Sequence, residues 1–297
     1  MFIRKPLKIE KNKKLEIDNQ TLLGIPYYII LALLIILPML LIIFYAFVDY
    51  KQGLYMKFTF KFFTSFFNNN NFIRVLLRSI YYSVMTTLVC LILGYPIAYS
   101  INKLNKKAQS IIFLLITAPM WINMLLRLNG LKTILGDNSI LVKIIQIFGF
   151  KGTTLLGTSF SIVLGMVYVF LPFMVIPIYT TLSKLDYIYI ESSYDLGANK
   201  KQTFLKVILP LSLPGILSGI TMVLLPSATT LVVQKILGEG KSDFILIGNL
   251  IEEKFVKAGN MNSFNEGAAM SLIIATIIML MIYFTKKLDR FNENEQD

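Results

Sequence analysis

Six runs of residues without a single Asp, Glu, Lys or Arg divide this chain of 297 residues. They cover residues 25–48, 79–101, 108–126, 155–183, 211–234 and 267–285. Each is about 19 residues or longer, the length that an α-helix needs to cross the ~30 Å hydrocarbon core of a bilayer. The sequence therefore predicts an all-α membrane protein with six transmembrane helices.

The composition also favours a lipid environment. Hydrophobic residues make up 55% of the chain and charged residues only 15%, whereas soluble domains have roughly 25% charged residues. The chain has no His, which excludes an imidazole metal site, and the lone Cys90 cannot form an internal disulfide. The net charge of +12 comes from basic residues between apolar runs, which indicates membrane topology rather than nucleic-acid binding.

The distribution of Lys and Arg predicts which side of the membrane each loop faces. With both termini inside, the cytoplasmic segments are 1–21, 102–107, 184–210 and 286–297, and they hold more than half of the basic residues. The first run, 25–48, is too long for the h-region of a signal peptide, about 7–15 residues, so we expect it to be retained as a span. The predicted organisation is a six-span domain over 22–286 between cytoplasmic tails 1–21 and 287–297.

The polar, basic loop 184–210 carries the most informative motif. In order, the motif contains Glu191, Ser192, Ser193, Tyr194, Asp195, Leu196, Gly197 and Ala198, then eight further residues, then Val207, Ile208, Leu209 and Pro210. We expect a short helix from Tyr187 to Leu196 that ends at Gly197 in a left-handed conformation. A second helix should start near Asn199, and Pro210 should open the fifth span.

This motif resembles the cytoplasmic coupling loop of ABC-importer permeases, in which Ser192 and Ser193 stand for two alanines and Val207 for an isoleucine. In that family the loop docks onto an ATPase subunit. The resemblance implies a docking role for Glu191, Ser192, Ser193, Asp195, Gly197, Ala198, Leu209 and Pro210. The chain has no Gly-rich phosphate loop of its own, so it is not expected to be an enzyme, and partner subunits are expected to bind ATP and Mg²⁺.

Further blocks resemble one branch of that family, the first permease subunit of spermidine/putrescine importers. They cover 93–99, 136–138, 194–198, 209–216, 237–241 and 247–251, within a resemblance over most of 25–285. The resemblance implies a type I importer permease (MetI-like) fold in the bacterial plasma membrane. The implied partners are a second, similar permease, two ATPase subunits, an extracytoplasmic polyamine-binding protein and the lipid bilayer, and no nucleic acid.

A path for a polycation should offer aromatic faces or carboxylates, yet no run contains a carboxylate. The aromatic candidates are Trp121, Tyr168, Phe170 and Phe173. The acidic candidates lie in the outer loops: Asp137, Glu239, Asp243, Glu252 and Glu253. Glu239 and Asp243 are preferred because they flank one of the resembling blocks. The alternatives are lipid-facing or packing aromatics and solvated loop charges.

Several segments carry weaker signals. Pro172 and Pro177 predict a bent fourth span. Residues 139–148 and 244–255 each predict a short helix on the outer side. The polar segments 1–20 and 288–297 predict loose tails.

Other functions remain as alternatives. An ABC importer could carry another small solute, such as a metal, thiamine or sulfate. A stand-alone secondary transporter usually has a charged residue at mid-membrane, and none of the six runs does. A membrane enzyme would need a catalytic set, and the runs contain no paired carboxylates.

Overall fold

The computed structural model describes residues 19–50, 56–147, 154–256 and 261–294, most of which are helical. The α-helices are α1 (Asn19–Leu31), α2 (Leu37–Phe47), α3 (Lys61–Asn68), α4 (Asn70–Asn102), α5 (Lys106–Thr117), α6 (Met124–Leu135), α7 (Ile140–Ile147), α8 (Ser159–Ser183), α9 (Tyr187–Asp195), α10 (Lys200–Thr203), α11 (Leu209–Leu211), α12 (Leu213–Thr229), α13 (Val232–Leu237), α14 (Ile247–Val256) and α15 (Met261–Asn294). Shorter turns of 3₁₀- or π-helix are η1 (Ala32–Ile36), η2 (Ala118–Trp121), η3 (Phe204–Ile208) and η4 (Ser242–Phe244), and the strands are β1 (Val48–Tyr50) and β2 (Met56–Phe58).

Within the described residues, four stretches of helix are each long and apolar enough to cross a bilayer. They are Pro26–Phe47, Asn70–Asn102, Ser159–Ser183 and Asn262–Tyr283. Two bent pairs also qualify: Lys106–Trp121 with Met124–Ile144, bent by 98°, and Lys200–Leu211 with Leu213–Thr229, bent by 60°. With each pair counted as one span, the number matches the six spans predicted from the sequence.

The third run, 108–126, is not the single straight helix that its lack of charge predicted. The helix ends at Trp121, and the chain turns at Ile122 and Asn123, which have extended backbone ψ angles of 138° and 131°. The Asn123 side chain then accepts a hydrogen bond from the Leu125 N–H at 2.8 Å and so caps α6. Because Asn carries no charge, this helix start lies hidden inside an uncharged run.

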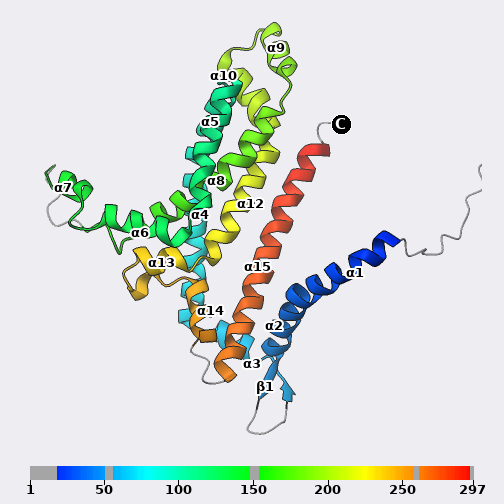
Figure 1. Ribbon diagram of the computed structural model, residues 1–297, viewed down its shortest axis with the longest axis vertical. Helices are drawn as coiled ribbons and strands as arrows, with labels where there is room; N and C mark the ends of the chain where they lie inside the picture. The colour runs from blue at the N-terminus through cyan, green and yellow to red at the C-terminus, as the bar shows by residue number, and fades with distance from the viewer. Residues whose placement is uncertain (1–18, 51–55, 148–153, 257–260, 295–297) are drawn as a thin grey trace, which may run out of the picture.

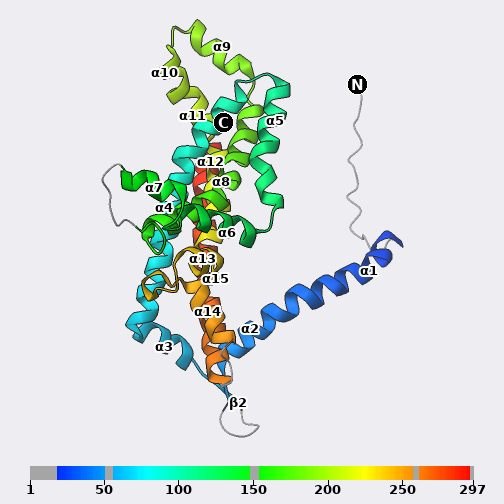
Figure 2. The same ribbon diagram turned by 60° about the vertical axis from the view of Figure 1, so that its left-hand side comes forward.

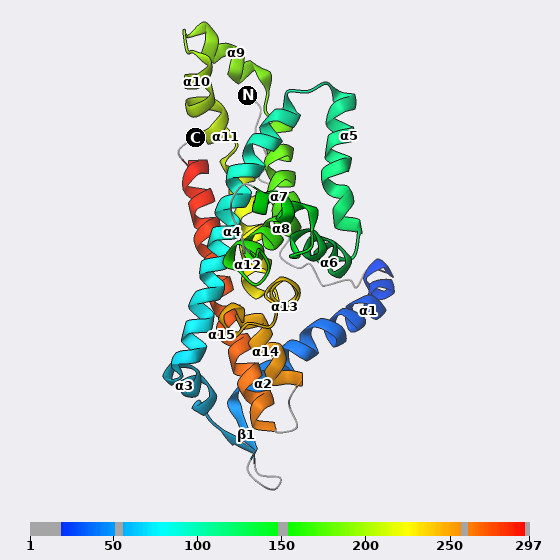
Figure 3. The ribbon, with the colours of Figure 1, turned by 90° about the vertical axis from the view of Figure 1, so that its left-hand side faces the viewer.

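The core consists of α4, α8 and α12, which contact one another along their lengths (Figures 1 and 3). Small residues allow this close approach. Gly94 of α4 faces Met174 of α8, and Gly219 of α12 faces the same Met174. Gly215, one turn earlier on α12, lies against the Pro177 carbonyl oxygen of α8. In a bilayer, where lipid tails are as apolar as the side chains, such backbone-to-backbone packing supplies much of the association between helices.

One proline lies at a different place in its span from the one expected. Helix α8 is continuous through Pro172 and Pro177, and the bend expected there stays a prediction. Pro210 does not open the fifth span, because it lies inside the segment Lys200–Leu211, and the 60° bend follows it. The first turn of α12 instead contains Pro214.

A widened π-helical turn precedes two of the prolines. The Leu37 N–H bonds to Ala32 O just before Pro38, and the Leu209 N–H bonds to Phe204 O just before Pro210. A proline ring clashes with the carbonyl four residues earlier and offers no N–H to it. The i→i+5 turn moves that carbonyl aside, so the helix continues.

One end of the molecule carries the hairpin of β1 and β2 together with α3 and the start of α15 (Figure 1). The strands pair antiparallel, with Asp49 opposite Lys57. Phe47 stacks on Phe58 at 5.3 Å between ring centroids, and the buried Asn265 donates to Val48 O at 2.7 Å. No pattern in the sequence predicted this hairpin. The first turns of α4 were not predicted either, because α4 begins at Asn70, nine residues before the uncharged run.

The short helices of the loops agree in part with the sequence. The predicted helix over 139–148 is α7, whose start is capped by Ser139. Ile140 on its apolar side is 79% exposed, whereas Val142 is fully buried. The helix predicted over 244–255 is α14, which begins at Ile247. In the segment 288–297, α15 continues to Asn294, so residues 288–294 are helical rather than loose. The tail 1–18 and Phe148 lie outside the described residues.

The N-terminal helices form an arm that leads away from the core (Figures 1 and 2). Helix α2 contacts α15, with Tyr45 and Phe264 edge to face at 4.9 Å between centroids. In the apolar part of Pro26–Phe47, only 6% of the residues are buried inside this chain, whereas 61% are buried in the apolar part of α8. The arm therefore offers its apolar surface to lipid or to another subunit.

Candidate functional site

The loop predicted to be functional forms a projection at the end of the molecule opposite the hairpin (Figures 1 and 3). We call residues 187–203, which comprise α9, the turn after it and α10, the knuckle. Helix α9 starts after Asp186, whose carboxylate accepts a hydrogen bond from the Ile188 N–H at 3.1 Å. Helix α10 starts after Asn199, which forms a reciprocal capping box with Gln202 at 2.9 and 2.8 Å. Both helix starts are thus encoded locally.

Gly197 terminates α9 in the predicted left-handed conformation, with φ of +81°. The Ala198 N–H donates to Ser193 O at 3.0 Å, and the Gly197 N–H donates to Tyr194 O at 2.8 Å. This pair of hydrogen bonds is a Schellman motif, which satisfies carbonyls that would otherwise be left free at the helix end. The motif reverses the chain within two residues and sets the angle between α9 and α10.

A buried hydroxyl pair holds the two helices of the knuckle together. The Ser193 and Thr203 hydroxyl oxygens lie 2.9 Å apart, and Thr203 is 1% exposed. The Ser193 hydroxyl donates to Ile190 O at 2.8 Å, so the Thr203 hydroxyl is the donor to the Ser193 oxygen. The angle set by Gly197 is therefore fixed a second time by a side-chain contact.

We predict that Ser193→Val destabilises the knuckle, because the Thr203 hydroxyl then stays buried without its side-chain partner. The expected cost is about 1–3 kcal/mol. Adding Thr203→Val should return part of that loss, since two apolar groups of similar shape can pack together. Hydrogen exchange of the amides of α9 and α10 in the purified protein measures this. Equal protection in all three variants would contradict a structural role for the pair.

The eight predicted docking residues occupy distinct places. Glu191, Ser192, Asp195 and Gly197 are exposed on the knuckle, whereas Ser193 faces inward. Ala198 is half-buried in the turn, and Leu209 and Pro210 lie half-buried on the segment that leads back to the core. The structure thus brings residues 191–198 onto one projection and places 209–210 at its base.

Apolar side chains outside the eight predicted docking residues are also exposed on the knuckle. Leu196 at the tip is 89% exposed, and Tyr187 and Ile188 are both 62% exposed. Large exposed apolar groups on a polar, solvent-facing projection usually mark a contact with another protein. The sequence indicated this surface through Tyr187, Ile188, Tyr189 and Ile190, four consecutive large apolar or aromatic residues outside any predicted span.

Aromatic residues anchor the knuckle to the core. Phe204, directly after α10, packs edge to face against Tyr95 at 5.9 Å and Tyr99 at 5.3 Å between centroids, both on α4. The Tyr95 hydroxyl lies 3.0 Å from the Ser212 hydroxyl at the 60° bend. The knuckle is therefore in direct contact with α4, and Tyr95 links that contact to the start of α12. Sequence reasoning missed this anchor because it depends on residues about 100 positions apart.

The aromatic candidates for a path do not form one cluster. Phe170 and Phe173 of α8 contact each other at 6.3 Å between centroids, and Phe170 is buried. Tyr168 on the same helix is 41% exposed. Trp121 is 87% exposed at the end of η2, with no ring contact to the other three among the described residues.

The two preferred acidic candidates lie in the loop after α13, close to basic side chains. Of the other candidates, Asp137 lies between α6 and α7, and Glu252 and Glu253 lie on α14. Glu239 and Asp243 are exposed. The Lys241 ammonium donates to Gly157 O at 2.9 Å, and the Glu239 carboxylate covers the same glycine. Arg78 of α4 donates to Ser242 O at 3.0 Å. These basic groups hold the loop in place and reduce the negative potential that its two acids create.

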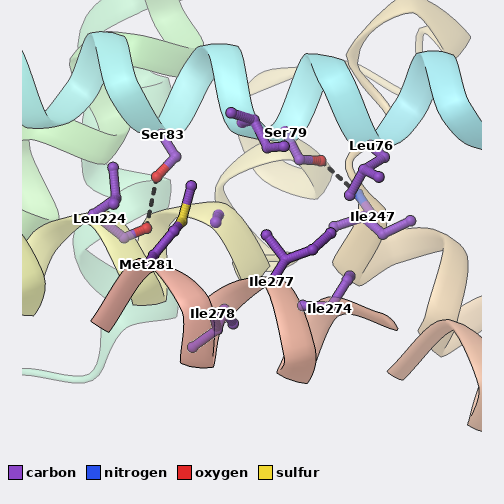
Figure 4. A pocket seen from close by; sticks show the side chains of 11 residues that line it. Leu76, Ser79, Ser83, Leu224, Ile247, Ile274, Ile277, Ile278 and Met281 are labelled. Carbon is purple, nitrogen blue, oxygen red and sulfur yellow. Dashed lines mark hydrogen bonds between the residues drawn. The ribbon is translucent and has the colours of Figure 1, made fainter. Parts of the chain in front are cut away.

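A small cavity of about 20 Å³ lies between α4, α12, α14 and α15 (Figure 4). Its lining is almost entirely apolar. The Ser83 hydroxyl is directed at Leu224 O, 2.6 Å away, and the Ser79 hydroxyl accepts from the Ile247 N–H at 2.8 Å. Both hydroxyls are thus occupied by backbone groups, and the cavity offers no carboxylate to a cation. Among the described residues, no group of three His, Cys, Asp or Glu side chains is placed to hold a metal ion.

Comparison with known proteins places this geometry in a known group. Residues 90–293 match the family model described as "Binding-protein-dependent transport system inner membrane component". The chain is 35% identical over 260 residues to the spermidine/putrescine transport system permease protein PotB of Escherichia coli (strain K12), covering 86% of this chain and 92% of that protein. It is 32% identical over 258 residues to the PotB of Haemophilus influenzae, with coverage of 86% and 89%.

Solved structures with a similar fold include a bacterial ABC transporter involved in the import of the acidic polysaccharide alginate. The TM-score is 0.74 at 17% sequence identity, covering 92% of this chain and 96% of that chain. The MetNI methionine ABC transporter in an inward-facing conformation matches with a TM-score of 0.50 at 17% identity, covering 75% and 99%. At these identities the likeness concerns the fold, which is that of ABC-importer permeases.

Proposed function

We propose, from the premise that this chain belongs to the family of binding-protein-dependent transport system inner membrane components, that it is the permease subunit of an ATP-driven polyamine importer. The proposal that the cargo is a polyamine rests on the 35% identity to a spermidine/putrescine permease over 92% of that protein's length. The chain is a transport subunit and not an enzyme, so partner ATPases hydrolyse ATP with bound Mg²⁺.

The proposed complex has the composition that importers of this family require. A second, similar permease completes the path and covers the apolar arm of α1 and α2. Two ATPase subunits receive the knuckles, and an extracytoplasmic polyamine-binding protein docks at the hairpin end. The end of α4 and the start of α5 lie at the same end of the molecule as the knuckle (Figure 3), and the turn between them carries Lys103, Lys106 and Lys107. This supports a cytoplasmic location for both termini and for the loop 184–210.

The proposed mechanism is alternating access. The loaded binding protein docks outside, ATP draws the two ATPases together, and the knuckle moves with the ATPase that holds it. Because Phe204 ties the knuckle to Tyr95 and Tyr99 of α4, the movement reaches the core helices. ATP and the binding protein shift the equilibrium only in so far as each binds one of the two states more tightly.

The path must accommodate a positively charged cargo. Spermidine is a flexible polycation, and the six uncharged runs offer it aromatic faces, hydroxyl groups and backbone carbonyls but no carboxylate. Such a path holds the cargo weakly, which lets it leave again. Selection among cargoes is then assigned mainly to the binding protein, with a contribution from the outer acids.

We predict that Glu239→Gln combined with Asp243→Asn raises the KM for spermidine about threefold to tenfold and leaves the maximal rate unchanged, because the cation loses long-range attraction at the path entrance. Uptake measured over a range of spermidine concentrations at low salt shows this. Asp137→Asn is the matched control, since Asp137 is an exposed outer acid in a different loop. An equal rise of KM in the control would assign the effect to net charge alone.

The experiment that tests the proposed function is uptake of labelled spermidine into proteoliposomes that contain this chain and its partner subunits, with the binding protein outside. We expect uptake that requires internal ATP and is reduced by unlabelled putrescine. ATPase activity that the binding protein stimulates, without spermidine uptake, would retain the importer and refute the cargo. Uptake without the ATPase subunits would refute the importer mechanism.

A further inference from the structure

A pocket of about 440 Å³ lies between the knuckle and the nearby ends of α4 and α8. We call it the knuckle pocket. Its polar lining comes from Tyr99, Asn102 and Lys103 at the end of α4, Tyr187 and Tyr194 of α9, and Lys200 of α10. The volume is within the range of small-ligand sites, about 300–1,000 Å³. Nothing in the coupling mechanism described above uses it.

The charge inside the knuckle pocket is of one sign. Two lysines line it and no carboxylate does. Lys103 Nζ lies 4.0 Å from the centroid of the Tyr99 ring, and among the described residues neither Lys103 nor Lys200 forms an ion pair. Three acids belong to α9 or cap it, Asp186, Glu191 and Asp195, and all three are exposed and absent from the lining. Asp186 lies between the lining residues Leu185 and Tyr187, and its carboxylate accepts a hydrogen bond from the Ile188 N–H. The pocket is therefore electropositive.

The negative ends of the helices do not account for these lysines. Carbonyls at the end of a helix attract cations, but amides already occupy several of them here. Asn102 donates to Leu182 O of α8 at 3.2 Å, and Gln109 donates to Asn102 O and Leu104 O at 3.0 and 2.9 Å. The lysine ammonium groups stay available to an external anion.

We propose that the knuckle pocket binds a phosphate group, with Lys103 and Lys200 as its cationic contacts and the Tyr187 and Tyr194 hydroxyls as further donors. Two sources of the phosphate share this chemistry: an anionic phospholipid headgroup and phosphate in solution. The rest of the lining is apolar, including Leu182 and Ile190, and basic pockets at the cytoplasmic ends of spans suit lipid headgroups. A bound phosphate joins α4, α9 and α10. The proposal concerns a ligand other than the cargo and holds whatever the cargo is.

The test uses the complete importer in a nonionic detergent, titrated with fluorescent short-chain phosphatidylglycerol. We expect Lys103→Gln and Lys200→Gln each to weaken binding about tenfold, the effect of losing one charge-assisted contact. Lys107→Gln and Lys201→Gln remove the same charge at exposed positions outside the lining and should leave binding unchanged. Tyr187→Phe and Tyr194→Phe remove only a hydroxyl each and should weaken binding about threefold if the lysine variants do not fold.

The outcomes separate the sources. Lysine-dependent binding of phosphatidylglycerol that inorganic phosphate does not displace identifies a lipid site. Displacement by inorganic phosphate, with the same dependence on Lys103 and Lys200, identifies a site for phosphate in solution. The proposal is overturned if the control lysines matter as much as the pocket lysines, or if the assembled importer binds neither probe. Because binding is measured without cargo, its failure is distinct from a failure of spermidine uptake.

Discussion

Gly197→Val is expected to abolish transport while leaving the protein inserted in the membrane. The backbone φ of +81° at this position costs a non-glycine residue about 1–2 kcal/mol, and more for a β-branched one. The Schellman motif at the end of α9 would be lost, and with it the angle between α9 and α10. Spermidine uptake should fall at least about tenfold, and the binding protein should no longer stimulate ATP hydrolysis.

A matched substitution isolates the backbone as the cause. A Cβ at Gly197 meets no atom within 4 Å, so the positive φ, rather than a clash with neighbouring residues, is what penalises a side chain here. Asn tolerates the left-handed conformation far better than Val, so Gly197→Asn should retain most of the uptake. The measurements are uptake, stimulated ATPase activity and the amount of protein in the membrane for both variants. Normal uptake by Gly197→Val would refute the knuckle as the coupling element.

Gly215→Ala is expected to damage the core rather than the coupling. The new Cβ would lie 2.5 Å from Thr181 Oγ1 and 2.8 Å from the Pro177 carbonyl oxygen. Because the carbonyl is part of the backbone of α8, α12 must move away, at a cost of about 1–3 kcal/mol. Gly215→Leu should prevent stable folding. The melting temperature in detergent and the amount of protein in the membrane report the loss.

The control for this prediction is Gly130→Ala on α6. Its Cβ would meet no atom within 4 Å, so only the higher helix propensity of Ala remains, about 1 kcal/mol in favour of the variant. We expect an unchanged or raised melting temperature there. If both alanine variants behaved alike, the close approach of α8 and α12 at Gly215 would not be a source of stability.

The features predicted well from the sequence depend on neighbours in the chain. A lack of charge over some twenty residues is enough to indicate a span. The capping residues Asp186 and Asn199 and the left-handed Gly197 act within one turn of their own helix. The bounds of α9 and the start of α10 were therefore predicted to within one residue. The role of these residues in docking remains a prediction.

The features that were missed depend on contacts between distant segments or on polarity without charge. Asn123 starts a new helix inside an uncharged run. Helix α4 continues through the charged Arg78, which precedes the uncharged run 79–101. The Arg78 guanidinium donates to Ser242 O of a distant loop. The Phe204 anchor requires two tyrosines of another helix. Pro210 was assigned to the start of the fifth span, but the widened turn before it lets the helix continue, and the bend comes later.

The packing of α2 against α15 has a consequence for biosynthesis. More than 200 residues separate Tyr45 from Phe264, so α2 enters the bilayer long before its neighbour is translated. Until α15 emerges, α2 already has the hairpin and α3 beside it, where Phe47 packs against Phe58 and Phe63, but it lacks the helix that it later contacts most. Asn265, which binds the Val48 carbonyl at the hairpin end, is missing at this stage as well. Insertion of the arm and its packing against α15 are therefore separate steps in time.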